Sequence, residues 1–278
     1  MQPSRPALLR ARTAAPPSSP ALPSPPLRAR LALAACAALF AAAPVRAQVT
    51  LKPDGLWRYL YTAGANATAG NSETTAFNLS AEGARVTDED KWTFRGTGAY
   101  GKTNGAVTSE RYAAGTQYNR NFSPNWFGFG SADGLREPPA NIDYRWSAAS
   151  GVGRHLVKNP NNTFDTTLGL GYTQDRYVRE TQVLGGLRDE YGRFELVLGE
   201  ESTHKLTQTT ILRQKFTVYP NISDGGNYRA MFDAGLSVAM TPALSLTTGL
   251  NYRYNTDPGA GLKRMDASLV TGVSLRFD

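Results

Sequence analysis

Residues 243–255, Ala-Leu-Ser-Leu-Thr-Thr-Gly-Leu-Asn-Tyr-Arg-Tyr-Asn, decide the fold of this chain. The even-numbered positions carry Leu, Leu, Thr, Leu, Tyr and Tyr, whereas the odd-numbered positions carry small or polar residues. A period of two is typical of a β-strand with one apolar and one polar face, and here the aromatic residues gather at one end. Residues 264–277 and 163–173 alternate in the same way.

The pattern recurs from about residue 56 to residue 277 as about twelve extended segments, separated by polar, Gly or Pro turns. Most segments are roughly 10–14 residues long, which is the length that a tilted strand needs to cross a bilayer. A sheet edge exposed to lipid would leave peptide groups without partners, so such a sheet must close. We therefore predict an all-β fold, an antiparallel transmembrane β-barrel of about twelve strands, for residues 48–278.

The connections between segments also fit a barrel. Outer-membrane barrels have short turns on the periplasmic side and longer loops on the outer side. Counted from a periplasmic N-terminus, the predicted periplasmic turns are short and lie at residues 88–90, 123–125, 158–162, near His204, and 241–243. The predicted outer loops at residues 178–192, 221–227 and 256–263 are longer, whereas the two earliest, near Gly70 and Asn104, are short.

All four tryptophans fall near segment ends, as expected for an aromatic girdle at the membrane interface. The alternative is that tryptophan fills the core of ordinary half-buried strands, as in a periplasmic β-sandwich that serves as a binding module. After residue 47 no stretch has 18 consecutive apolar residues, so the sequence does not predict helical membrane spans.

Residues 1–47 are predicted to be a cleaved signal peptide. They contain no Gly, Asp or Glu, and an apolar run at residues 31–43 precedes the small-residue site Val45-Arg46-Ala47. Cleavage is expected after Ala47, with Ala43 as the second choice. Cys36 could belong to a lipoprotein signal, but the apolar run continues past it, which favours an ordinary position within the leader.

Removal of the leader changes the charge balance. Its six charged residues are all arginines, so the 30 basic residues fall to 24, against 23 acidic residues. No basic surface for nucleic acid is expected from so balanced a chain. The single cysteine also leaves with the leader, and His155 and His204 are the only histidines. We therefore predict no disulfide, no metal site and no cofactor.

The polar faces of the later segments carry charged residues that a barrel would direct into its lumen. These lumen-facing candidates are Glu195, Glu201, Arg213, Lys215, Asp233, Arg253 and Arg276. About twelve strands lie between a filled eight-stranded barrel and an open sixteen-stranded pore. The mixed charges could therefore fill the interior by pairing or line a narrow water path, and the sequence leaves both possibilities open.

Residues 96–103, Gly-Thr-Gly-Ala-Tyr-Gly-Lys-Thr, match the phosphate-loop pattern. A phosphate loop requires a helix directly after its Lys-Thr pair, so that the helix N-terminus meets the phosphates. Here Asn104-Gly105 follows, which is a strong hairpin signal. The pattern therefore predicts a strand and a tight turn, and not a nucleotide site.

A serine hydrolase could be assembled from Ser202, His204 and an acid such as Glu201. However, neighbouring residues of a strand point to opposite faces, and no lipase-like cluster of Ser, His and Asp is present. A histidine at a hairpin turn is the simpler interpretation. We predict no catalytic residue, so the chain is not expected to be an enzyme, although an outer-membrane hydrolase is kept as an alternative.

The end of the chain, Gly272-x-x-Leu275-x-Phe277, resembles the signal that delivers barrels to the outer-membrane assembly machinery. Barrels with this signal usually end on the aromatic residue, whereas here Asp278 follows. The expected partners are that machinery and outer-membrane lipid, with no nucleic acid. The oligomeric state does not follow from the sequence.

Short turn and strand motifs along the chain resemble those of the YdiY-type family, described as salt-induced outer-membrane proteins of unknown function. They lie at residues 68–75, 219–221, 224–229, 236–241, 244–246, 252–258 and 261–263. The resemblance implies an outer-membrane barrel and supplies no catalytic residue. The expected function is small-solute passage or a role in envelope stress, and a salt response would be inherited from the family's name alone.

Overall fold

The computed structural model describes residues 53–68 and 74–277. The predicted leader, Cys36 and the turn near Gly70 lie outside this part of the chain. The described residues form twelve strands and one short 3₁₀ turn at Pro138–Ala140. The strands are β1 (Trp57–Thr68), β2 (Thr74–Val86), β3 (Asp90–Thr103), β4 (Ala106–Ser123), β5 (Trp126–Glu137), β6 (Ile142–Lys158), β7 (Asn162–Val183), β8 (Gly186–Lys205), β9 (Thr210–Pro220), β10 (Tyr228–Ala239), β11 (Leu244–Asn255) and β12 (Met265–Phe277).

Each strand is antiparallel to its neighbours in sequence, and β12 pairs with β1 to close the barrel. The closing ladder is short, and runs from Tyr59 opposite Phe277 to Ala63 opposite Val273. The backbones approach closely here, because a Cβ on Gly272 would lie 2.6 Å from the carbonyl oxygen of Ala63. The predicted closed antiparallel barrel of about twelve strands is confirmed, and the alternative of two packed sheets is wrong.

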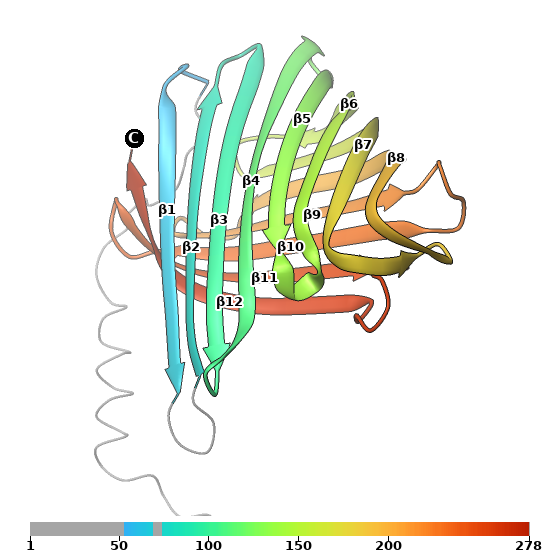
Figure 1. Ribbon diagram of the computed structural model, residues 1–278. Helices are drawn as coiled ribbons and strands as arrows, with labels where there is room; N and C mark the ends of the chain where they lie inside the picture. Colours follow the sequence, from blue (N-terminus) through green and yellow to red (C-terminus); the bar gives the residue numbers. More distant parts are fainter. Residues whose placement is uncertain (1–52, 69–73, 278) are drawn as a thin grey trace, which may run out of the picture. The chain divides into compact units, whose positions relative to one another are not determined.

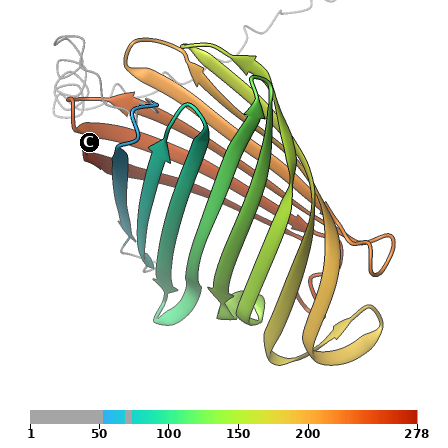
Figure 2. The same ribbon diagram turned by 90° about the horizontal axis from the view of Figure 1, so that it is seen from above.

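The barrel is flattened into two walls. In Figure 1, β1–β6 stand in front of β9–β12 and cross them at a steep angle, and Figure 2 shows the same two walls from above. The long strands β7 and β8 bend between the walls at one side and project past their neighbours. We call the end of the barrel that carries Trp57 and Phe277 the terminal rim, and the opposite end the distal rim.

All five connections at the terminal rim are short, as predicted, and span residues 87–89, 124–125, 159–161, 206–209 and 240–243. One prediction for the distal rim is wrong. Residues 178–192 do not form a long loop, because β7 continues to Val183 and β8 begins at Gly186. The turn between them, Leu184-Gly185, has positive φ angles of 52° and 76°. The hairpin turn Asn104-Gly105 also has positive φ angles, of 50° and 80°.

The outer wall is apolar. Leu250, Leu269 and Val273 are exposed on its surface, and Leu269 is 71% exposed. In water, so many exposed large apolar side chains would promote aggregation, whereas in lipid they are the expected surface of a barrel. No helix among the described residues is long and apolar enough to span a membrane.

Aromatic side chains mark both edges of this apolar surface. Trp57, Trp92 and Trp126 lie at the terminal rim, and Trp57 packs 6.4 Å from Trp92, measured between ring centroids. Towards the distal rim, the ring of Trp146 lies 5.4 Å from that of Tyr172. On β5, Trp126 is eight residues from the partner of Trp146, or roughly 26 Å along the strand at ~3.3 Å per residue. At the tilt of about 35–45° that such strands have, this is about 20 Å along the barrel axis, close to the apolar band of about 25 Å that membrane barrels present.

The interior is filled on the terminal side of the barrel. Phe127 is 1% exposed and forms a small apolar core with Phe129 and Val197. The ring of Phe127 lies directly over Gly153, where a Cβ would come 2.1 Å from the ring. Glycine is therefore required at this position to let the aromatic ring lie flat against the inner wall. The space that remains lies nearer the distal rim.

Candidate functional site: the cavity in the lumen

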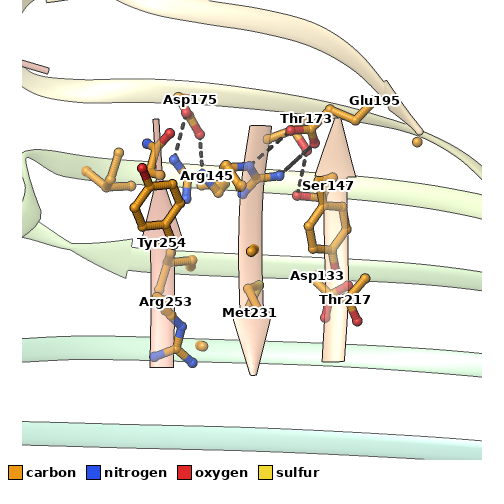
Figure 3. A pocket seen from close by; sticks show the side chains of 18 of the residues that line it. Asp133, Arg145, Ser147, Thr173, Asp175, Glu195, Thr217, Met231, Arg253 and Tyr254 are labelled. Atoms are coloured by element: carbon orange, nitrogen blue, oxygen red, sulfur yellow. Dashed lines mark hydrogen bonds and ion pairs between the residues drawn. The ribbon is translucent and has the colours of Figure 1, made fainter. Parts of the chain in front are cut away.

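The lumen contains a cavity of about 740 Å³. Its lining comes from most of the strands, with charged and hydroxyl side chains on both walls. Figure 3 shows Arg145, Asp175, Thr173 and Glu195 near one another at one side of the cavity, and Arg253 at the other. A space of this volume accommodates a small molecule.

Ion pairs between opposite walls form the floor of the cavity. Glu201 on β8 lies 3.8 Å from Lys91 on β3 and 3.7 Å from Lys215 on β9. Arg213 on β9 lies 3.9 Å from Glu82 on β2. On the shorter way round the barrel, four strands separate β3 from β8, and four separate β2 from β9. The contacts Glu201–Lys91 and Arg213–Glu82 therefore span the lumen, whereas Lys215 is the cross-strand neighbour of Glu201 on β9. We call these five residues the cross-lumen layer.

The cross-lumen layer lies at the terminal end of the cavity. Glu82, Glu201 and Lys215 line the cavity, whereas Lys91 and Arg213 do not. The side chains of this layer are 30–51% exposed, so water reaches them. Their separations of 3.7–3.9 Å exceed the usual length of a hydrogen bond. The floor is thus a loose electrostatic contact and not a packed plug.

A tighter network covers the wall of the cavity nearer the distal rim. Glu195 accepts hydrogen bonds from Arg193, from Arg229 and from the hydroxyl of Thr173. Asp175 accepts from Arg193 at 2.9 Å and from Arg145 at 2.7 Å. The carboxylates of Glu195 and Asp175 are almost fully buried, so both depend on these partners. We call these six residues, of which Thr173 is one, the distal ion network.

The projecting tip of β7 and β8 forms the roof of the cavity together with the loop at residues 256–264. The backbone N–H of Leu184 donates to Asp257 Oδ2 at 2.8 Å, which joins the tip to the loop. Val183 and Leu184 line the cavity, as do Pro258 and Leu262 of the loop. The cavity therefore lies between a roof at the distal rim and a floor at mid-lumen.

The structure brings most of the predicted lumen residues to this space. Glu195, Glu201, Lys215, Asp233 and Arg253 line the cavity. Arg213 lies in the cross-lumen layer beneath it. Arg276 is half-buried in β12, where it pairs with Leu60 in the closing ladder, and it does not line the cavity.

The residues of the predicted assembly signal lie at the end of β12. Leu275 and Phe277 are exposed on the outer wall, and Phe277 packs edge-on against Tyr61 of β1 at 5.7 Å between ring centroids. Gly272 lies in the closely packed joint between β12 and β1. Asp278 lies outside the described residues. Recognition by the assembly machinery stays a prediction.

Several lumen residues were not predicted from the sequence, among them Arg145, Asp175, Arg193 and Arg229. For Asp175 a signal was present, because the polar face of residues 163–173 continues to it with the same period of two. Arg193 was missed because residues 178–192 were interpreted as a loop, which put Arg193 at the very start of the expected segment, although it shares the face of Glu195 and Glu201.

The residues considered for a serine hydrolase are only partly brought together. His204 Nε2 lies 3.1 Å from Ser202 Oγ, and His204 Nδ1 lies 3.0 Å from Asn162 Oδ1 of β7. Glu201 does not join them, because it points into the lumen. Ser202 is 1% exposed, so this arrangement offers its hydroxyl no open path to a substrate. We interpret the three side chains as a hydrogen-bonded group that satisfies buried polar atoms.

The residues that match a phosphate loop belong to β3 and its turn. Residues 96–103 are extended, and Asn104-Gly105 leads directly into β4 without a helix. The geometry that a phosphate loop requires is therefore absent from this segment. Within the described ranges, no three His, Cys, Asp or Glu side chains are arranged to hold a metal ion.

Comparison with known proteins identifies relatives of the chain. Residues 61–277 match the family model described as protein of unknown function, DUF481. The uncharacterized protein YdiY of Escherichia coli K12 is 24% identical over 199 residues, which is 70% of this chain and 73% of YdiY.

Solved structures similar to the chain are membrane barrels with low sequence identity. The NanC porin is 13% identical, with a TM-score of 0.46, and the match covers 78% of this chain and 98% of the porin. The KdgM porin is 8% identical, with a TM-score of 0.42 and coverages of 80% and 100%. The translocator domain of the autotransporter NalP from Neisseria meningitidis is 13% identical, with a TM-score of 0.43 and coverages of 90% and 95%. These scores are too low to support a functional argument.

Proposed function

The chain belongs to the DUF481 family of proteins of unknown function, and we propose that it is an integral outer-membrane barrel that passes small polar solutes through its lumen. The observation that carries the proposal is the charged cavity of about 740 Å³ inside a closed barrel. A polar, water-accessible interior inside an apolar wall is typical of barrels that conduct solutes. The exposed apolar band and its two aromatic edges support the membrane location.

In this proposal, the cross-lumen layer controls passage. It consists of partly exposed side chains with separations close to 4 Å, so side-chain rotation alone can open it. A role in envelope stress or salt response stays a prediction from the family resemblance.

We expect the wild-type protein to conduct potassium chloride in planar lipid bilayers, in discrete steps. Replacing both acids of the cross-lumen layer, Glu82→Gln with Glu201→Gln, removes every negative charge from it. Lys91, Lys215 and Arg213 then repel one another, and the floor opens. The step conductance should rise by about twofold or more, because the narrowest part of a pore dominates its resistance.

The matched control is Glu110→Gln, which makes the same chemical change outside the lumen. Glu110 adjoins the lumen-lining Arg111 on β4, so it faces the outer side, where it pairs with Arg136. Its replacement should leave the step conductance unchanged. If neither the wild type nor the double variant conducts, the proposal of solute passage is wrong.

A further inference from the structure

Seven arginines line the cavity, and five of them lie on strands near its distal side. Arg111, Arg145, Arg193, Arg229 and Arg253 come from β4, β6, β8, β10 and β11, respectively, and all border the same space. Four carboxylates form ion pairs with them, and these are Glu137, Asp175, Glu195 and Asp233. The group therefore has one more guanidinium than carboxylate.

Arg253 is the member of this group with the weakest pairing. Its ion pair joins Nη2 to Asp233 Oδ1 at 4.0 Å, which is too long for a hydrogen bond. Its Nε is buried and has no hydrogen-bond partner, and no other buried side-chain N or O atom in the described part of the chain lacks one. A buried donor without a partner is costly, so such an atom in a native structure requires an explanation.

The Nε and Nη2 atoms form one edge of the guanidinium, and neither atom has an acceptor within hydrogen-bond distance. The edge is a planar pair of donors that matches the two oxygens of a carboxylate. The side chain of Arg253 is 32% exposed and lines the cavity, so a ligand can reach the guanidinium from the lumen. A small rotation towards the ligand would give Nε the acceptor that it lacks.

The surroundings of Arg253 favour a negative charge. Arg111 lies close enough to Arg253 and Arg145 for their like charges to repel. A bound anion reduces this repulsion. Asp266, the register partner of Arg253 on β12, also lines the cavity but makes no ion pair with Arg253 within 4.0 Å.

We propose that Arg253, with Arg111 beside it, forms a binding subsite in the lumen for the carboxylate group of a small organic anion. This inference rests on the proposed solute passage and names the chemical class of the solute. The cavity volume of about 740 Å³ suits a small molecule and not a polymer segment. The carboxylate binds on the distal side of the cross-lumen layer.

The test is isothermal titration of the detergent-solubilised barrel with sodium malonate as the probe. We expect saturable binding by the wild-type protein and a dissociation constant at least about tenfold larger for Arg253→Gln, because one charge-assisted bidentate contact is lost. The control is Arg154→Gln, since Arg154 packs over the exposed Trp126 ring on the outer wall. It should bind malonate as the wild type does.

The side chain of Arg253 makes no hydrogen bond in the described barrel, so Arg253→Gln should still fold. Its heat-dependent mobility in electrophoresis should match that of the wild type. Absence of malonate binding by the wild type, or equal binding by the wild type and Arg253→Gln, would overturn the subsite. The titration does not require conduction. If the barrel conducts but does not bind malonate, the subsite is wrong and the proposed function stands. If it binds malonate but does not conduct, the subsite stands and the proposed function is wrong.

Discussion

Replacing Glu195 by alanine is expected to lower the free energy of unfolding by about 3–5 kcal/mol, the usual cost of breaking a buried ion pair by removing one partner. The Glu195 carboxylate is almost fully buried and accepts hydrogen bonds from Arg193, Arg229 and Thr173. Its removal leaves two guanidiniums close together in the wall of the lumen with one fewer anion. The measurement is equilibrium unfolding by denaturant in lipid vesicles, followed by tryptophan fluorescence.

Two variants separate the charge of Glu195 from other effects. Glu195→Gln preserves the shape of the side chain and removes only its charge, so it should also be strongly destabilising. Glu190→Ala changes an acid of the same strand whose ion pair with Arg176 is 3.9 Å long and exposed. Such a surface pair contributes only about 0–1 kcal/mol. Equal losses for Glu195→Ala and Glu190→Ala would contradict the importance of the distal ion network.

Replacing Leu269 by arginine is expected to destabilise the membrane-inserted barrel by about 2–4 kcal/mol, the cost of placing an arginine near the middle of the lipid-facing surface. Leu269 is 71% exposed and lies beside Leu250 of β11 on the outer wall. In a water-soluble protein, a substitution at so exposed a position would have almost no effect. The same unfolding measurement in vesicles therefore reports on the environment of this face.

The control for Leu269→Arg is Ser268→Arg in the same strand. Ser268 pairs with Asn251 on the lumen side, two residues after Asp266 on the same face of β12, so an added cation there remains in water. We expect it to cost much less than Leu269→Arg. If the two variants lose similar amounts of stability, the outer wall does not face lipid.

The sequence alone predicted the class of fold because the bilayer imposes a simple rule on every strand that crosses it. In β11 and β12, lipid on one side and water on the other produced the strict alternation of apolar and polar residues. The rule fails where strands leave the membrane. The tip of β7 and β8 has water on both faces, so residues 178–192 carry no alternation and were interpreted as a loop.

A register shift contributes to the same error. The pairing of β7 with β8 is irregular between Arg176 and Thr181, so the inward and outward positions no longer follow from those before the shift. The turn itself, Leu184-Gly185, lacks the Asn-Gly signature that identified the hairpin at residues 104–105.

The arrangement of the candidate site could be predicted less well than the fold. Period-two alternation assigns Glu201 and Lys215 to the lumen face, but it does not say which charges meet. The contact between Glu201 and Lys91 depends on how the closed barrel flattens, which brings strands that are far apart in the sequence together across the lumen. The same holds for Arg213 and Glu82.

The central claim is that the side chains of β11 alternate between lipid and lumen. A spin label attached to single cysteines at residues 244–255, in a chain without Cys36, measures this directly through collisions with oxygen in lipid and with a water-soluble nickel complex. The claim predicts that oxygen accessibility alternates with a period of two, with maxima at Leu246 and Leu250, and that it is low at Asn251. The claim would be contradicted if oxygen accessibility were low at both leucines. It would also be contradicted if the nickel complex reached all twelve labelled positions equally.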